Sequence, residues 1–373
     1  MDDRFKGRRI IVFSFTRTGT KLSRNLCLKL RGSGRECQGY APDRYAGGGI
    51  LPFPENSSLL LRSGWGKDAF LFIGAAGIAV RWIAPWVKDK FTDSPVLVLD
   101  EKGQYVIPLL SGHIGGAVSL ADEIAALTGA DPVHTTATDV QGKFAVDVFA
   151  GQNGLLITDR QTAKEISAAV LEGEKIACYI KYPEYHLSGT IPESLSVCRI
   201  ISETEAYSYR IIIADGAGQT KGDPDSFRVQ TGGIREERTL LLKPKNITAG
   251  IGCRKGVSLE LLEEGLCQIL EQNGLEIGQV EKIASIDLKR DEQALLDLSE
   301  KYGIPFLTYC AEELAGIQSV TSTSEFVKTI TGVDNVCERA ALLCCENGTL
   351  VQGKCIRKGM TAALARRPLE IRF

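Results

Sequence analysis

PLLSGHIGGAVSLADEIAALTGADPVHTTATD, residues 108–139, has the pattern of a strand, a glycine-rich loop, a helix and a second strand in close succession. The first strand ends at Leu110, the loop covers residues 111–116, and an amphipathic helix follows over residues 118–127. Residues 132–136 form the next apolar run, which predicts another strand. Strands that alternate with helices predict an open α/β sheet, in which ligands collect at loops outside the carboxyl ends of strands.

The sequence before this segment extends the same pattern toward the N-terminus. Apolar runs predict buried strands over residues 9–15 and 70–73, and a helix over residues 20–30 lies between them. Residues 95–99 and 105–110 predict a pair of strands joined at Glu101-Lys102-Gly103. We therefore expect residues 1–139 to form an N-terminal domain with an open α/β sheet.

The rest of the chain divides into two parts at Lys243-Pro244-Lys245-Asn246, where the composition changes. We expect residues 140–243 to form a small α+β middle module and residues 244–373 a C-terminal α/β domain. The expected strands of the middle module cover residues 176–181, 197–202 and 209–214, with a helix near 161–172. In the C-terminal domain we expect strands at 247–251, 282–286, 305–309, 350–356 and 361–365, and helices at 258–270, 291–302 and 336–343.

Composition excludes several classes of protein. The 373 residues carry 44 Lys and Arg against 46 Asp and Glu, so the net charge of −2 offers no broad cationic surface for nucleic acid or anionic lipid. No window approaches the roughly 18 apolar residues of a membrane span, and the N-terminal residues do not resemble a secretory signal. The eleven cysteines are scattered and include no C-x-x-C pair. This use of cysteine predicts a cytoplasmic protein with neither a disulfide framework nor a zinc site.

The loop at residues 111–116 contains the strongest candidate for chemistry, His113. Ser111 and Gly112 precede it, and Gly115 and Gly116 lead into the helix, so the backbone can approach a ligand closely. Imidazole exchanges protons near pH 7 and also binds transition metals. The alternative is a histidine that caps the helix or bonds a neighbouring carbonyl group.

Thr135, Thr136 and Asp139 follow the expected strand end, so we expect their side chains to face the same cleft as His113. Asp139 is a candidate to act as a base or to orient the imidazole. The alternative for Asp139 is an ordinary Asx turn. His134, inside the expected strand, is interpreted as structural.

Two further glycine turns join a strand to a helix. The first contains Gly74 and Gly77, and tight strand–helix packing explains it as well as anion binding does. The second, GIGCRKG at residues 250–256, is one residue too long for the dinucleotide fingerprint, and the chain has no phosphate-binding P-loop motif. Gly252, Arg254 and Lys255 remain as a turn suited to carboxylates.

Two other groups of residues favour a structural interpretation. The acids of residues 331–339 precede a helix, where they more often cap the helix than catalyse. Trp65, Trp82 and Trp86 would suit a large planar ligand, but aromatic residues at helical spacing more often belong to a core.

Long motifs then resemble one known family. GAAGIAVRWIAPWVKDK at 74–90, IPLLSGHIGGA at 107–117 and TTATD at 135–139 resemble the N-terminal part of the CbiG family, the cobalt-precorrin-5A hydrolases of anaerobic cobalamin biosynthesis. GIGCRKG, SIDLKRDE at 285–292 and TGVDNVCERAAL at 331–342 are similar to the C-terminal domain of that family. The resemblance spans the chain in the right order and is weakest in the middle module.

The resemblance implies a reaction, a partner and no separate cofactor. Members of the family add water to the δ-lactone of cobalt-precorrin-5A, open it and release acetaldehyde, which gives cobalt-precorrin-5B. The cobalt belongs to the substrate, so no metal site of the protein is implied. The implied partner is this tetrapyrrole, and a homo-oligomer or transient contact with neighbouring pathway enzymes stays open.

Lactone opening requires a base for water and hydrogen-bond donors for the tetrahedral oxyanion. We assign His113 as the base, or alternatively as an axial contact to cobalt, and Asp139 as the residue that orients it. The substrate-binding candidates are Gly74, Gly77, Ser111, Gly112, Gly115, Gly116, Thr135, Thr136, Gly252, Arg254 and Lys255.

Two other functions fit parts of the same pattern. A carrier that passes corrinoid intermediates between enzymes would bind the tetrapyrrole without changing it. A nucleotide-dependent oxidoreductase or transferase would explain the glycine turns, but the dinucleotide spacing is missing.

Overall fold

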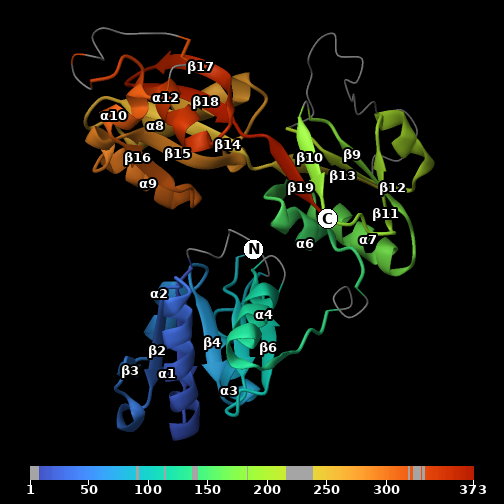
Figure 1. Cartoon of the computed structure of the whole chain (residues 1–373), viewed down its shortest axis with the longest axis vertical. Coiled ribbons are helices and arrows are strands. Elements are labelled where there is room, and N and C mark those ends of the chain that lie inside the picture. Colours follow the sequence, from blue (N-terminus) through green and yellow to red (C-terminus); the bar gives the residue numbers. More distant parts are fainter. Residues whose placement is uncertain are drawn as a thin grey trace. The chain divides into compact units, whose positions relative to one another are not determined.

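The computed structural model describes residues 8–89, 92–112, 115–136, 142–182, 184–215, 238–317, 320–321, 329 and 332–373. These residues form a mixed α/β protein with several mostly parallel sheets, which confirms the expected fold class. The chain divides into two compact units, Met1–Gly151 and Gln152–Phe373 (Figure 1). The expected domain boundaries near residues 139 and 243 stay predictions. No helix among the described residues is both long enough and apolar enough to cross a bilayer.

The first unit is built on a seven-stranded sheet with the order β3-β2-β1-β4-β5-β6-β7. All neighbouring strands are parallel except β5 and β6, which form the antiparallel hairpin expected from the sequence. The strands are β1 (Ile10–Ser14), β2 (Cys37–Ala41), β3 (Ile50–Pro52), β4 (Ala69–Ile73), β5 (Val96–Leu99), β6 (Tyr105–Leu110) and β7 (Asp131–Pro132). The helices are α1 (Arg17–Gly32), α2 (Ser58–Gly64), α3 (Ala76–Ile83), α4 (Ala117–Thr128) and α6 (Val146–Gln152), with the short 3₁₀ helix η2 (Asp43–Tyr45).

Helices cover both faces of this sheet because successive residues of a strand point to opposite sides. Ile10 and Val12 pack on one side with the apolar stripes of α1 and α4. Ile11 and Phe13 pack on the other side with α2 and α3. The central strands β1, β4 and β5 are buried along their whole length, as expected for strands covered on both faces.

The second unit contains two five-stranded sheets. The middle sheet has the order β11-β9-β12-β13-β8, and the C-terminal sheet has the order β16-β15-β14-β18-β17. The middle elements are β8 (Leu155–Ile157), α7 (Arg160–Leu171), β9 (Ile176–Ile180), β11 (Leu195–Cys198), η3 (Ile201–Ala206), β12 (Tyr209–Ile213) and β13 (Thr239–Pro244). The C-terminal elements are β14 (Ile247–Cys253), α8 (Leu259–Gln272), η5 (Ile277–Gln279), β15 (Val280–Ile286), η6 (Asp287–Lys289), α9 (Gln293–Tyr302), β16 (Phe306–Tyr309), α10 (Ala311–Ala315), α12 (Val336–Cys345), β17 (Thr349–Arg357) and β18 (Met360–Arg366).

Helix α12 packs directly on the backbone of β14. A Cβ atom at Gly250 would lie 1.9 Å from the carbonyl oxygen of Cys337, so only glycine permits this approach. The first glycine of the GIGCRKG segment therefore has a packing role. The opposite face of the sheet is covered by α8 and α9.

The last strand of the chain connects the two halves of the second unit. Strand β19 (Leu369–Arg372) leaves the C-terminal sheet and pairs in parallel with β10 (Tyr185–Ser188) of the middle region. Asn153 strengthens the connection, because its side chain bonds both the N–H and the carbonyl group of Arg372.

Two expected strands are shorter than predicted. Strand β7 ends at Pro132, so the expectation of a strand over residues 132–136 was wrong beyond that residue. Its neighbour β6 pairs with it at only two positions, and the chain then leaves the sheet edge. The strand expected at 197–202 ends at Cys198, where its pairing with β9 ends, and residues 201–206 form the 3₁₀ helix η3.

Candidate functional site

The sheet of the first unit separates the predicted site residues into two groups. Gly74 follows the carboxyl end of β4, whereas Ser111 follows the carboxyl end of β6. Because β6 runs antiparallel to β5, its last residue, Leu110, pairs with Val96 at the start of β5. The two glycine-rich turns therefore lie at opposite ends of the strands. We use "edge" for such an end of the sheet: the hairpin-end edge is the one at Ser111, where the β5–β6 hairpin is open, and the carboxyl edge of β4 is the one at Gly74.

The loop at the hairpin-end edge is fixed by contacts within itself. Ser111 is 7% exposed and has a left-handed backbone with φ of 54°, which is uncommon for a residue other than glycine. Its carbonyl group accepts the N–H of Ala117 at 3.1 Å, and the carbonyl of Gly112 accepts the N–H of Val118 at 3.0 Å. Two N–H groups of the first turn of α4 are thus used inside the loop and are not offered to an anion.

Gly115 packs against Ser111 so closely that no side chain fits. A Cβ atom there would lie 2.1 Å from the Cβ atom of Ser111 and 2.5 Å from its carbonyl oxygen. Gly116 has φ of 86° and forms the N-cap of α4. His113, the predicted base, lies outside the described residues.

A buried carboxylate, Asp93, joins this loop to the segment before β5. The Oγ–H of Ser111 donates to the backbone carbonyl of Asp93 at 2.9 Å. The side chain of Asp93 accepts the indole N–H of Trp65 and the backbone N–H groups of Lys88 and Asp89, at 2.9–3.2 Å. Sequence reasoning missed both Asp93 and Lys88, although Lys88 belongs to the quoted motif at residues 74–90.

The residues after β7 lie beside the same strand, β6. The N–H of Val133 donates to the carbonyl of Val106, and Nε2 of His134 lies 3.0 Å from a carboxylate oxygen of Asp122 in α4. His134 therefore lies after the strand, so the expectation that it lies within the strand was wrong. Thr135 is exposed and Thr136 is half-buried. Asp139 lies outside the described residues.

The carboxyl edge of β4 has a different character. The N–H of Gly74 donates to the carbonyl of Leu99, and Gly77 is exposed beneath the guanidinium group of Arg81. The ring of Trp82 packs between Phe15 and Phe53, with ring centroids 5.4 and 5.7 Å away. Trp82 thus belongs to the aromatic core cluster on the α2–α3 face.

The GIGCRKG turn in the second unit already holds an internal anion. Gly252 lies within β14, opposite Thr361, and the N–H of Gly256 donates to the carboxylate of Glu292 at 2.8 Å. Burial disfavours the charged form of Glu292, but the hydrogen bonds from Lys289 and Gly256 outweigh it, so its pKa is lowered. Arg254 and Lys255 are exposed.

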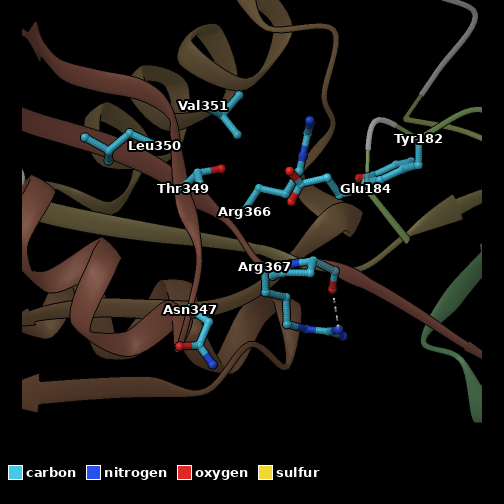
Figure 2. A pocket seen from close by; sticks show the side chains of 9 residues that line it. Tyr182, Glu184, Asn347, Thr349, Leu350, Val351, Arg366 and Arg367 are labelled. Atoms are coloured by element: carbon cyan, nitrogen blue, oxygen red, sulfur yellow. Dashed lines mark hydrogen bonds between the residues drawn. The ribbon is translucent and has the colours of Figure 1, made fainter. Parts of the chain in front are cut away.

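A pocket of about 280 Å³ lies between the middle and C-terminal parts of the second unit (Figure 2). In Figure 2 the side chains of Arg366 and Arg367 leave the end of β18 in different directions. Each is already paired with an acid, Arg366 with Asp215 and Arg367 with Glu281. Sites for drug-sized ligands usually measure about 300–1,000 Å³, so this pocket suits a single substituent and not a macrocycle.

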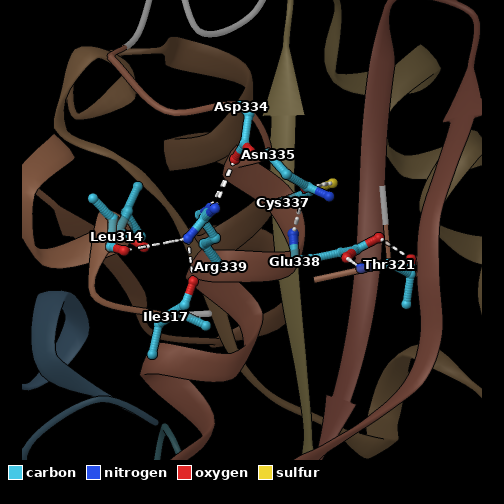
Figure 3. A network of polar contacts seen from close by, with 9 residues as sticks. Leu314, Ile317, Thr321, Asp334, Asn335, Cys337, Glu338 and Arg339 are labelled. Carbon is cyan, nitrogen blue, oxygen red and sulfur yellow. Dashed lines mark hydrogen bonds and ion pairs between the residues drawn. The ribbon is translucent and has the colours of Figure 1, made fainter. Parts of the chain in front are cut away.

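The TGVDNVCERAAL segment builds a structural network (Figure 3). Glu338 is fully buried, and its carboxylate accepts the hydroxyl and N–H of Thr321 and the N–H of Lys354, each at 2.6 Å. Burial disfavours ionisation of Glu338, but these hydrogen bonds outweigh it and its pKa is lowered. On the other side of α12, Arg339 pairs with Asp334 and donates to the carbonyl of Ile317. These acids therefore serve the fold, as the structural interpretation of this segment predicts.

Comparison with known proteins places the chain in a family. The profile described as "Cobalamin synthesis G N-terminal" matches residues 60–139, "Cobalamin biosynthesis central region" matches 144–224, and "Cobalamin synthesis G C-terminus" matches 247–365.

Two curated relatives named cobalt-precorrin-5A hydrolase are similar over most of their length. The protein of Salmonella typhimurium is 32% identical over 368 residues, which cover 96% of this chain and 98% of that protein. The protein of Priestia megaterium is 33% identical over 303 residues, which cover 80% and 79%. A crystal structure of a cobalamin biosynthesis protein G homologue from Sulfolobus solfataricus matches over 97% of both chains, with 23% identity and a TM-score of 0.41. The chain thus belongs to the CbiG family of cobalamin biosynthesis and is a homologue of cobalt-precorrin-5A hydrolases.

Proposed function

We propose that this protein hydrolyses the δ-lactone of cobalt-precorrin-5A and releases acetaldehyde, giving cobalt-precorrin-5B. The observation that carries the proposal is the 32% identity to the Salmonella hydrolase over 96% of the chain. The macrocycle brings its own cobalt, so the protein has to bind the ring, activate water and stabilise the oxyanion.

We assign the chemistry to the hairpin-end edge of the first unit. His113, within the glycine-rich loop, accepts the proton of the attacking water, and Asp139 orients the imidazole. Attack on the lactone carbonyl forms a tetrahedral oxyanion, and collapse of this intermediate breaks the C–O bond of the lactone, which leaves a carboxylate and an alkoxide on the extruded carbon. The alkoxide then forms the C=O bond of acetaldehyde as the C–C bond between the extruded carbon and the macrocycle breaks. The electron pair of that bond stays on the macrocycle, which takes up a proton. The backbone N–H groups near Gly115 and Gly116 are the proposed donors to the oxyanion. The N–H groups of Ala117 and Val118 do not belong to this set, because the loop already uses them.

Binding of the peripheral carboxylates needs cations that are not already paired. Lys88 is exposed and lies next to Asp93 at the hairpin-end edge, and among the described residues it has no ion-pair partner. Arg254 and Lys255 are exposed on the second unit. We propose that Lys88 pairs with a carboxylate of the substrate at the hairpin-end edge. Arg254 and Lys255 stay carboxylate-binding candidates of the second unit, taken by itself.

The test is an anaerobic incubation of the purified protein with cobalt-precorrin-5A, in which acetaldehyde is trapped and the tetrapyrrole is weighed by mass spectrometry. We expect acetaldehyde, and a product whose mass has fallen by acetaldehyde and risen by one water. Tight binding with an unchanged mass would favour a carrier of corrinoid intermediates. If the protein neither binds nor converts cobalt-precorrin-5A, both functions are contradicted.

A further inference from the structure

The hairpin-end edge depends on one residue with no proposed chemical role, Asp93. We propose that Asp93 is a positioning residue. Its side-chain carboxylate binds Lys88 and Asp89 and its backbone carbonyl binds Ser111, so these two segments keep a constant position relative to one another. The inference rests on the proposed function, because that function assigns the chemistry to this edge.

The side chain of Asp93 organises the segment before it. It is 4% exposed, and its carboxylate accepts the N–H of Lys88 at 2.9 Å and the N–H of Asp89 at 3.0 Å. The indole N–H of Trp65, whose ring stacks on Phe70, adds a third donor at 3.1 Å. A buried carboxylate with no donors would be very unfavourable, so these bonds strongly favour one conformation of the turn.

The backbone of Asp93 holds the other loop. Its carbonyl accepts the hydroxyl of Ser111, and both groups are buried. Ser111 in turn accepts the N–H of Ala117, the first residue of α4. Hydrogen bonds therefore lead without a break from Lys88 through Asp93 and Ser111 to the start of α4. A displacement of Asp93 would move both a candidate cation and the loop of the predicted base.

A matched control exists at the other end of the same strand. The carboxylate of Asp100 accepts the backbone N–H groups of Lys102, Gln104 and Tyr105 at 2.6–2.8 Å. It follows β5 just as Asp93 precedes it, and it closes a backbone turn in the same manner. Asp100 lies at the carboxyl edge of β4, away from the proposed chemistry. Replacing it measures what the loss of a turn-closing carboxylate does by itself.

The experiment compares Asp93→Asn with Asp100→Asn in the full chain. Hydrogen exchange of the amides of Ala117 and Val118 is measured without substrate, and kcat and KM for acetaldehyde release are measured with cobalt-precorrin-5A. We expect Asp93→Asn to speed exchange at both amides and to lower kcat by about 10- to 100-fold, since small displacements of catalytic groups are costly. Asp100→Asn should leave exchange and kcat within about twofold of wild type.

A second variant covers the case in which Asp93→Asn does not fold. Ser111→Gly removes the hydroxyl together with the Cβ atom, and glycine accepts the left-handed backbone at that position without strain. The fold-change in kcat should be larger than the fold-change in KM, and Tm should change little. Unchanged exchange at Ala117 and Val118, or a kcat within twofold of wild type in Asp93→Asn or in Ser111→Gly, would overturn the inference. If the wild type releases no acetaldehyde, the proposed function fails, while faster exchange in Asp93→Asn alone would still support the positioning of the loop.

Discussion

The two edges of the first sheet carry similar glycine-rich turns and use them differently. At the hairpin-end edge, the loop closes on itself through Ser111 and Gly115 and is joined by hydrogen bonds to the buried Asp93. At the carboxyl edge of β4, Gly74 is half-buried, residues 75–77 are exposed, and the turn lies beside a cluster of aromatic rings. A glycine-rich strand-to-helix turn therefore does not identify a site by itself. Buried polar groups around the turn distinguish a loop that hydrogen bonds hold in place from a turn that only packs a strand against a helix.

The largest expected effect is at His113. We predict that His113→Ala lowers kcat for acetaldehyde release by about 10²–10⁴-fold, the usual contribution of a positioned acid or base. His186→Ala is the control, since that histidine is exposed on β10 of the second unit. If His113→Ala kept turnover within a few-fold of wild type, the base would have to be sought elsewhere.

Gly115→Ala and Gly77→Ala compare the two turns directly. A methyl group at Gly115 would clash with the Cβ atom and backbone oxygen of Ser111, so the loop must shift. We expect a loss of about 1–3 kcal/mol in unfolding free energy, typical of overpacking, and about 10²-fold in kcat. At Gly77 the new methyl would meet only the flexible end of Arg81 at 3.3 Å.

Because alanine favours the helix more than glycine does, Gly77→Ala should leave stability unchanged or slightly raised. Chemical denaturation and turnover assays on the two variants check this. Equal losses at both positions would remove the distinction between the edges.

Charge reversal tests which edge meets the carboxylates of the substrate. We predict that Lys88→Glu raises KM about tenfold, equivalent to about 1.4 kcal/mol, with a smaller effect on kcat. Arg81→Glu, at the carboxyl edge of β4, should leave KM near the wild-type value. Steady-state kinetics at fixed ionic strength provide the comparison, and the opposite ranking would move substrate binding to the carboxyl edge of β4.

The smallest expected effect concerns acid stability at Asp100. Burial raises the pKa of this carboxyl group, but hydrogen bonds from Tyr105, Lys102 and the other N–H groups of the turn outweigh it, so the pKa in the folded protein is lowered. A lowered folded pKa contributes stability that is complete above the unfolded value near 4 and is lost as the pH falls through the folded value.

Asp100→Asn should therefore show a weaker fall in Tm than wild type as the pH drops from about 5 to 3. Thermal unfolding at a series of pH values checks this. Identical pH profiles for the two proteins would show that the Asp100 turn contributes nothing to acid sensitivity.

Much of the fold follows from local patterns in the sequence. The runs at β1, β4 and β9 are continuous and apolar because both faces of these strands are covered, and glycine or polar residues mark their ends. The apolar stripe of α4 ends at Gly129, which has the left-handed backbone of a helix C-terminus.

The strands that sequence reasoning missed depend on partners far away in the chain. Strand β3 is three residues long, largely exposed and embedded in a loop-like stretch. Within the described part of the chain, strands β10 and β19 pair with each other alone, and no local pattern connects them. Pairing between distant segments fixes these strands, so a window of sequence does not contain the information.

The site residues stay a prediction, but the placement of some of the segments that carry them can be compared with the structure. The loop at Ser111 and the residues after β7 were expected beside one another, and both flank β6 in the structure. The separation of Gly74 from Ser111 was missed, although the turn at Glu101-Lys102-Gly103 reverses the chain between them. Asp93 was missed because an acid before a strand has no distinctive spacing, and its importance comes from three donors that only the fold brings together.

The pairing of β10 with β19 sets an order of events during synthesis. The ribosome releases residues 185–188 almost half a chain before residues 369–372, and domains fold as they emerge. Through that interval β10 lacks β19, its strand partner in the described structure, and an unpaired strand edge is a template for the wrong neighbour. A nascent chain stalled before Leu369 should therefore need protection by a chaperone, and the final strand completes the middle region as the last step of its folding.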